Sequence, residues 1–162
     1  MRVFKINRDN RLVAVELPPI KRMVLYHHNK PAFLRFPEHI FIVHWNYSHL
    51  DRLFHTVGSY PIKLLLKIEN KYYFPKLSDS NITDLHYCIN YTHTNVYGDN
   101  LEHLLIKTID HFWASKFGHR PLCVDIWEKA TREKRCVCNT FEQVAEPRNL
   151  YIISAEELRK IR

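Results

Sequence analysis

The stretch His39-Ile40-Phe41-Ile42-Val43-His44-Trp45 decides the fold, because five of its seven residues are large and apolar. Its β-branched and aromatic side chains favour a strand that is buried within a sheet. A second apolar run covers residues 62–68 and is interrupted only by Lys63 and Lys67. It is far too short, and too charged, to span a membrane. We therefore expect both runs to be strands in the sheet of a folded domain.

Further strands are predicted on both sides of these runs, because apolar and polar residues alternate in the way that half-buried strands require. They cover residues 1–6, 12–17, 20–26 and 72–74. Pro18-Pro19 separates the second of these strands from the third, because proline cannot extend a ladder of hydrogen bonds. Residues 48–56 are expected to form a short helix or a connection. The first half of the chain is therefore predicted to be an antiparallel sheet.

Helices are predicted after this sheet. Residues 99–116 carry an apolar stripe at helical spacing, with Asp99 or Asn100 as the cap and Gly118 as the end. The stripe consists of Leu101, Leu105, Ile109, Phe112 and Trp113. Ser154-Ala155-Glu156-Glu157 has the form of a capping box and predicts a short terminal helix. The expected fold class is α+β, one domain over residues 1–162, with the sheet in the N-terminal half and the helices after it.

Composition excludes several classes of protein. The chain has 162 residues, of which 46% are hydrophobic and 13% aromatic, so it is neither disordered nor fibrous. No charged start followed by an apolar segment and a cleavage site opens the sequence, so we expect a cytoplasmic protein with no membrane partner.

Positive charge is concentrated in the first half of the chain. Residues 1–81 contain 13 Lys and Arg residues against six Asp and Glu, whereas residues 82–162 contain eleven of each. The basic half could face nucleic acid or an acidic protein surface, and solvated strand faces would give the same pattern. Stacking with bases would require exposed aromatic residues, for which the candidates are Tyr26, Trp45, Tyr47, Tyr72 and Tyr73.

The chain has four cysteines: Cys88, Cys123, Cys136 and Cys138. In a cytoplasmic protein they are expected to be free thiols. Zinc could use Cys136 and Cys138 with help from Cys123, His119 or His86, but structural zinc sites prefer two to four residues between paired ligands. The alternation Cys-Val-Cys suits a strand in which both sulfurs are buried on one face. We therefore expect no metal and no cofactor.

A polar segment over residues 75–98 carries the best candidate for catalysis. Cys88 lies in this weakly periodic stretch shortly before the predicted helix, where a thiol is a better nucleophile than one buried in a strand. Asn81 stands seven residues earlier, and its amide could donate a hydrogen bond to an oxyanion. His86 would share a face with Cys88 if the stretch is extended.

The order of elements resembles that of the ubiquitin-conjugating enzymes. Their sheet is followed by a Tyr-Pro turn, then an Asn-Ile segment and a Cys-Leu pair, matched here by Tyr60-Pro61, Asn81-Ile82 and Cys88-Ile89. The chain is also similar to short plasmid and phage relatives such as the PRTRC-system B proteins. Their helix ends near Phe-Phe-x-Ser-x-Phe, and residues 112–117 read Phe-Trp-Ala-Ser-Lys-Phe. The resemblance covers roughly residues 33–119.

This resemblance implies a protein of a bacterial mobile element or phage that carries a ubiquitin-like protein as a thioester on Cys88. Asn81 would stabilise the oxyanion during transfer to an amine, and the partners would be the ubiquitin-like protein and its activating enzyme. Two alternatives remain open. The chain could be a non-catalytic scaffold that enters a homo- or hetero-assembly, or a basic module that binds nucleic acid.

Overall fold

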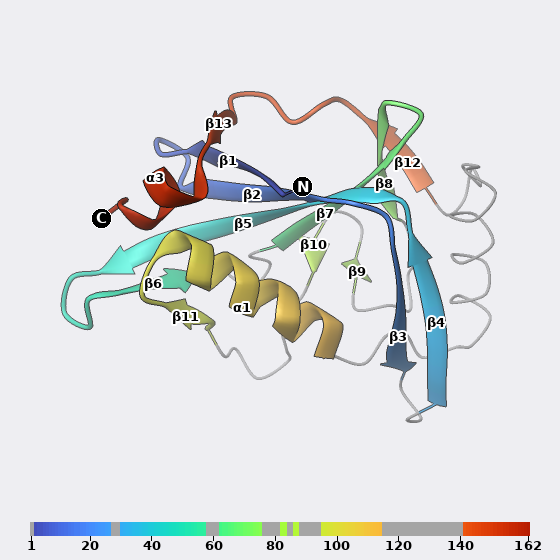
Figure 1. Ribbon diagram of the computed structural model, residues 1–162, viewed down its shortest axis with the longest axis horizontal. Coiled ribbons are helices and arrows are strands. Elements are labelled where there is room, and N and C mark those ends of the chain that lie inside the picture. The colour runs from blue at the N-terminus through green and yellow to red at the C-terminus, as the bar shows by residue number, and fades with distance from the viewer. Residues whose placement is uncertain are drawn as a thin grey trace.

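A computed structural model of the chain describes residues 2–26, 30–57, 62–75, 82–83, 86–87, 95–114 and 141–162. Its centre is strand β5, Glu38–Ser48, which contains the apolar run that begins at His39. Strand β2, Leu12–Leu17, pairs with β5 on one side, and β7, Ile62–Ile68, pairs with it on the other. Because both pairings are antiparallel and in register over six residue pairs, these three strands form the middle of the sheet (Figure 1).

The sheet extends to both sides of this centre, in the order β12-β8-β7-β5-β2-β1-β13. One side adds β1, Val3–Asn7, and then β13, Tyr151–Ile153. The other side adds β8, Lys71–Pro75, and then β12, Phe141–Val144. Two strands from the end of the chain therefore lie at the two opposite ends of this order (Figure 1).

Short strands extend the same sheet away from the main order. Strand β6, Leu53–Thr56, pairs with the end of β5 and with β11, Tyr97–Gly98. Strand β10, His86–Tyr87, pairs with β7 and with β9, Ile82–Thr83. The segment 48–56 was expected to be a helix or a connection, and half of it is strand. The turn that precedes β6 uses Arg52 at φ 57°, a backbone conformation that sequence alternation does not reveal.

One face of the sheet is covered by helix α1, Leu101–Ala114, and this confirms the helix predicted from the apolar stripe. Asn100 caps it, because the Asn100 side-chain oxygen accepts a hydrogen bond of 2.9 Å from the backbone N–H of His103. Phe112 of the helix packs edge-on against Phe41 of β5, with ring centroids 5.0 Å apart. Both rings are fully buried, so the main hydrophobic core lies between α1 and the sheet.

The approach of β11 to the helix depends on Gly98. A Cβ atom at this position would lie 2.4 Å from the backbone nitrogen of Leu104, which is far inside van der Waals contact. The clash would involve backbone atoms of the first helical turn, which cannot move aside as a flexible side chain could. Gly98 therefore fixes how closely the short strand packs against α1.

The opposite face of the sheet holds a second, smaller core of Ala14, Ile40, Ile42, Leu65 and Tyr72. Val144 and Leu150, near the ends of the segment that joins β12 to β13, pack against this core. The chain then turns into helix α3, Ala155–Arg159. Its predicted capping box is confirmed, because the Ser154 hydroxyl accepts from the backbone N–H of Glu157 and the Glu157 carboxylate accepts from the N–H of Ser154.

The expected fold class is wrong. The described residues form mostly antiparallel, open sheet with only the helices α1 and α3, and the α+β arrangement of the ubiquitin-conjugating enzymes, with helices after the sheet, is not supported. The difference arises because 141–144 and 151–153 are strands that return to the sheet, so the sheet is not confined to the N-terminal half. Within the described ranges, no helix is long and apolar enough to cross a membrane.

Candidate functional site

The corner Pro18-Pro19 separates β2 from a hairpin that leaves the main sheet. This hairpin consists of β3, Ile20–Tyr26, and β4, Lys30–Phe36, and we call it the arm. The two strands pair over seven residue pairs, from Ile20 opposite Phe36 to Tyr26 opposite Lys30. They form a separate two-stranded sheet, so neither pairs with another described strand. The arm extends away from the sheet past the C-terminal end of α1 (Figure 1).

The inner face of the arm is attached to the body of the protein. Val24 is buried and belongs to the main core. The guanidinium of Arg22, two residues earlier on the same face, lies over the ring of Trp113, 5.1 Å from its centroid. This cation–π contact joins β3 to the end of α1.

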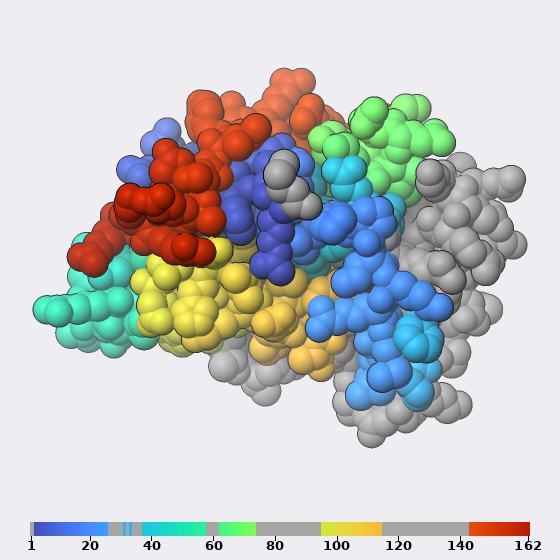
Figure 2. Space-filling view, in the orientation of Figure 1, coloured from blue at the N-terminus to red at the C-terminus, as the bar shows by residue number. Residues whose placement is uncertain are grey.

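The outer face of the arm is apolar and exposed. Met23, Leu25 and Phe33 retain 58%, 43% and 52% of their accessible surface, whereas Phe41, Leu64 and Leu66 in the central strands of the sheet are buried. Met23 and Phe33 are directly opposite each other in the register, so their side chains lie on one face. In the view of Figure 2 the arm stands at the molecular surface. Exposed apolar groups that gather in this way mark interaction surfaces.

The arm is also basic. Its strands contain Lys21, Arg22, Lys30 and Arg35 and no acidic residue. Lys21 stands opposite Arg35 in the register, and its ammonium lies 4.8 Å from the centroid of the Phe33 ring. The outer face therefore presents apolar side chains with positive charge at their border.

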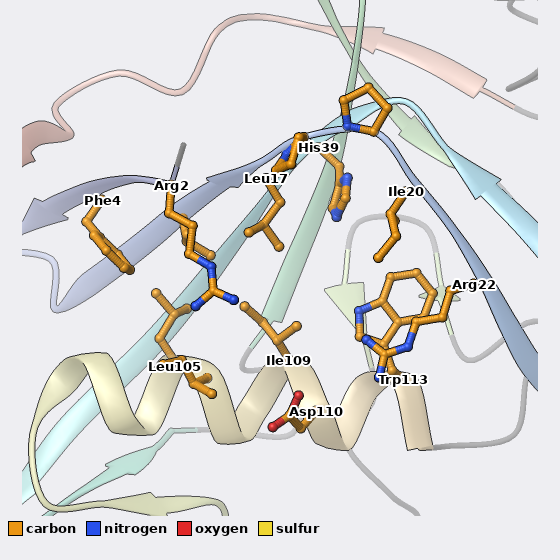
Figure 3. Close-up of a pocket in the computed structure, with 14 residues that line it drawn as sticks. Arg2, Phe4, Leu17, Ile20, Arg22, His39, Leu105, Ile109, Asp110 and Trp113 are labelled. Atoms are coloured by element: carbon orange, nitrogen blue, oxygen red, sulfur yellow. The ribbon is translucent and has the colours of Figure 1, made fainter. Parts of the chain in front are cut away.

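A cavity of about 430 Å³ lies where the arm joins the body. It opens between α1 and the Pro18-Pro19 corner, and β1, β2 and β5 contribute to its walls (Figure 3). Its lining residues are Arg2, Phe4, Val15, Leu17, Pro18, Pro19, Ile20, Arg22, His39, Leu105, Ile106, Ile109, Asp110 and Trp113. The chain leaves the main sheet at the two prolines, so β3 does not pair with β2. The space between α1 and the corner is therefore not filled by a strand and forms the cavity.

Four of these residues are polar, and they differ in burial. Arg2, Arg22 and Asp110 are exposed, whereas His39 is only 1% exposed. The Nδ1 atom of His39 lies 2.9 Å from the carbonyl oxygen of Pro37, and the imidazole ring packs edge-on against Phe41. Burial lowers the pKa of His39 below its ordinary value, with the Pro37 hydrogen bond and Glu38 opposing this effect. His39 is therefore a neutral group near neutral pH.

The residues predicted to carry catalysis, Cys88 and Asn81, lie outside the described residues, as does Tyr60-Pro61. His86 is described only through its backbone, which forms β10. The thioester hypothesis therefore stays a prediction. Cys123, Cys136, Cys138 and His119 also lie outside, and among the described residues no three metal-binding side chains come together.

The aromatic residues proposed for base stacking do not offer open ring faces where they are described. Trp45 and Tyr72 are buried, and Tyr47 and Tyr73 are half-buried. Among the described residues of the basic half, the large exposed aromatic ring is instead that of Phe33, which sequence reasoning missed. Two features of the sequence pointed to this strand pair as a separate basic element: the double proline at 18–19, and the absence of any acidic residue between residues 20 and 36.

Comparison with family models, with curated proteins and with solved structures finds no match to this chain.

Proposed function

We propose that this protein is a non-catalytic assembly module that binds an acidic partner protein through the outer face of the arm. The observation that carries this proposal is the exposure of Met23, Leu25 and Phe33 on a ribbon whose charged residues are all basic. Burial of such side chains at an interface would remove apolar surface from water, and each Å² of apolar surface buried contributes roughly 25 cal/mol of favourable free energy. Met, Phe and Arg are also enriched in protein interfaces.

The acidic groups that would complement the arm belong to another molecule. Four described carboxylates already form ion pairs within the chain, in the pairs Lys5–Glu16, Lys67–Glu38, Arg159–Glu102 and Lys160–Glu156, and none of these pairs involves the arm. Two arms that met face to face would bring their basic residues together, and like charges in an interface repel. A partner of different sequence therefore fits the arm better than a second copy.

A protein fits the outer face better than nucleic acid does. Binding along a phosphate backbone requires a series of cations, whereas the centre of this face is occupied by Met23, Leu25 and Phe33. The two strands of the arm also have no further strand beside them among the described residues. A partner segment could add to the edge of the ribbon through backbone hydrogen bonds, with apolar side chains on Met23 and Phe33 and carboxylates near Lys21.

The test uses the full chain and three labelled probes: a peptide of alternating leucine and glutamate, the same peptide with lysine in place of glutamate, and duplex DNA. Binding is measured by fluorescence anisotropy for the wild type and for the double variant Met23→Ser/Phe33→Ser. Leu50→Ser is the matched control, because Leu50 is 93% exposed in the β5–β6 turn, away from the arm. Circular dichroism establishes that each variant is folded.

We expect the glutamate peptide to bind and the lysine peptide to bind much more weakly. The double variant should weaken the affinity about tenfold or more, and Leu50→Ser should leave it unchanged. Equal affinity of the wild type and the double variant for the glutamate peptide would refute the proposal. Preferential binding of DNA, with an affinity that falls steeply as salt rises, would replace it with the nucleic-acid alternative.

A further inference from the structure

We infer that the cavity between α1 and the Pro18-Pro19 corner binds a small molecule with an apolar body and a single carboxylate. The inference does not depend on the proposed function, because the cavity faces the inner side of the arm and the interaction surface is on the outer side. Only Arg22 and Ile20 of the arm line the cavity, and Met23, Leu25 and Phe33 do not.

The walls of the cavity suit an apolar body. Phe4 and Val15 come from the sheet, and Leu105 comes from the helix; all three are buried, and Ile109 is half-buried beside them. The aromatic ring of Trp113 lies at one end of the cavity, against the Arg22 side chain (Figure 3). A volume of about 430 Å³ lies within the range of pockets that enclose small ligands.

The rim of the cavity supplies positive charge. Arg2 and Arg22 are both exposed and both line it, and neither forms an ion pair with any described carboxylate. Arg22 is held in place by the Trp113 ring, at 5.1 Å from its centroid. Figure 3 shows the guanidinium of Arg2 extending from the sheet toward the helix. An anionic group at the Arg2 side of the mouth would therefore meet a guanidinium group, which suits a carboxylate through paired hydrogen bonds.

The charge of the rim points to one negative charge on the ligand. Asp110 lines the same rim from α1, so the three exposed ionic groups carry a net charge of +1. His39 adds no charge near neutral pH, because burial keeps its imidazole neutral. A carboxylate matches this balance, whereas a doubly charged phosphate would leave an unmatched negative charge beside Asp110.

The probe is decanoate, with decanol as the neutral molecule of the same chain length. Binding of both to the full-length chain is measured by isothermal titration calorimetry near neutral pH. Arg2→Gln removes one guanidinium from the rim, and Arg8→Gln, in the exposed turn between β1 and β2, is the matched control. Ile109→Phe places a larger side chain in the cavity, and thermal unfolding establishes that this variant is folded.

We expect decanoate to bind the wild type at least about tenfold more tightly than decanol does. Arg2→Gln should remove most of that difference and Arg8→Gln none of it, while Ile109→Phe should weaken both molecules. Absence of decanoate binding, equal affinity for decanoate and decanol, or an unchanged affinity in Ile109→Phe would each overturn the inference. Met23→Ser/Phe33→Ser should bind decanoate as the wild type does, so failure of the proposed function is distinguishable from failure of this inference.

Discussion

Strand β5 and the arm have similar apolar sequences but different surroundings. In β5 both faces are covered, one by α1 and the other by the smaller core, so Phe41 and Ile40 are buried. In the arm Val24 of the inner face is buried, whereas Met23, Leu25 and Phe33 on the outer face are exposed. Apolar alternation therefore tells which residues share a face, but what covers that face depends on residues far away in the sequence.

The largest expected contrast is between the two phenylalanines Phe41 and Phe33. Phe41→Ala would leave a cavity against Phe112 and His39 and should lower the free energy of unfolding by about 3–5 kcal/mol. Phe33→Ala removes a half-exposed ring and should lower it by less than about 1 kcal/mol. Urea denaturation followed by circular dichroism measures both. Equal losses would mean that the outer face of the arm is covered in solution.

A smaller contrast is expected between neighbours on β3. Val24 is buried in the main core and Met23 is 58% exposed, although they are adjacent in the chain. Val24→Ala should cost about 1–2 kcal/mol, and Met23→Ala should be close to neutral. The same denaturation experiment applies. If Val24→Ala were neutral, the arm would not be packed against the body as described.

The smallest expected change concerns pH. Burial lowers the pKa of His39 in the folded chain, so lowering the pH below about 6.5 protonates this histidine in the unfolded chain first. As the pH is lowered from about 7.5 to about 5.5, the free energy of unfolding should therefore decrease, because the pH approaches the lowered pKa of the folded state.

His39→Gln should make this fall smaller in urea denaturation at the two pH values. Some dependence should persist, because burial and nearby Arg11 also lower the pKa of His44. If the free energy of unfolding depended on pH identically in the wild type and in His39→Gln, the pKa of His39 would not be lowered in the folded protein.

The sequence predicted those elements whose signals are local. Three such elements depend on residues close together in the chain and are confirmed: the strand at 62–68, the helix that begins after Asn100 and the capping box at Ser154. Strands β12 and β13 are short and have little alternation of their own. They are strands because β12 pairs with β8 and β13 pairs with β1, where Phe4 stands opposite Ile153. No local sequence pattern predicts such a contact.

The candidate site shows the same limit. The residues Ile20-Lys21-Arg22-Met23-Val24-Leu25-Tyr26 are typical of any half-buried strand, and only the double proline hinted that this strand leaves the sheet. The cavity joins Arg2 to Asp110, 108 positions apart in the chain, through contacts that form only in the folded state. Cys88 was chosen for its local setting, and its reactivity stays a prediction that iodoacetamide labelling of the folded chain would test.

The placement of β12 and β13 has a consequence for how the chain is made. Until the ribosome has synthesised residues 141–153, β1 and β8 each lack the neighbour that completes the sheet on their side. Unpaired strand edges of this kind recruit other chains. A copy truncated before residue 141 would retain these two open edges and would be prone to aggregate, whereas β12 and β13 cover both edges when they are present.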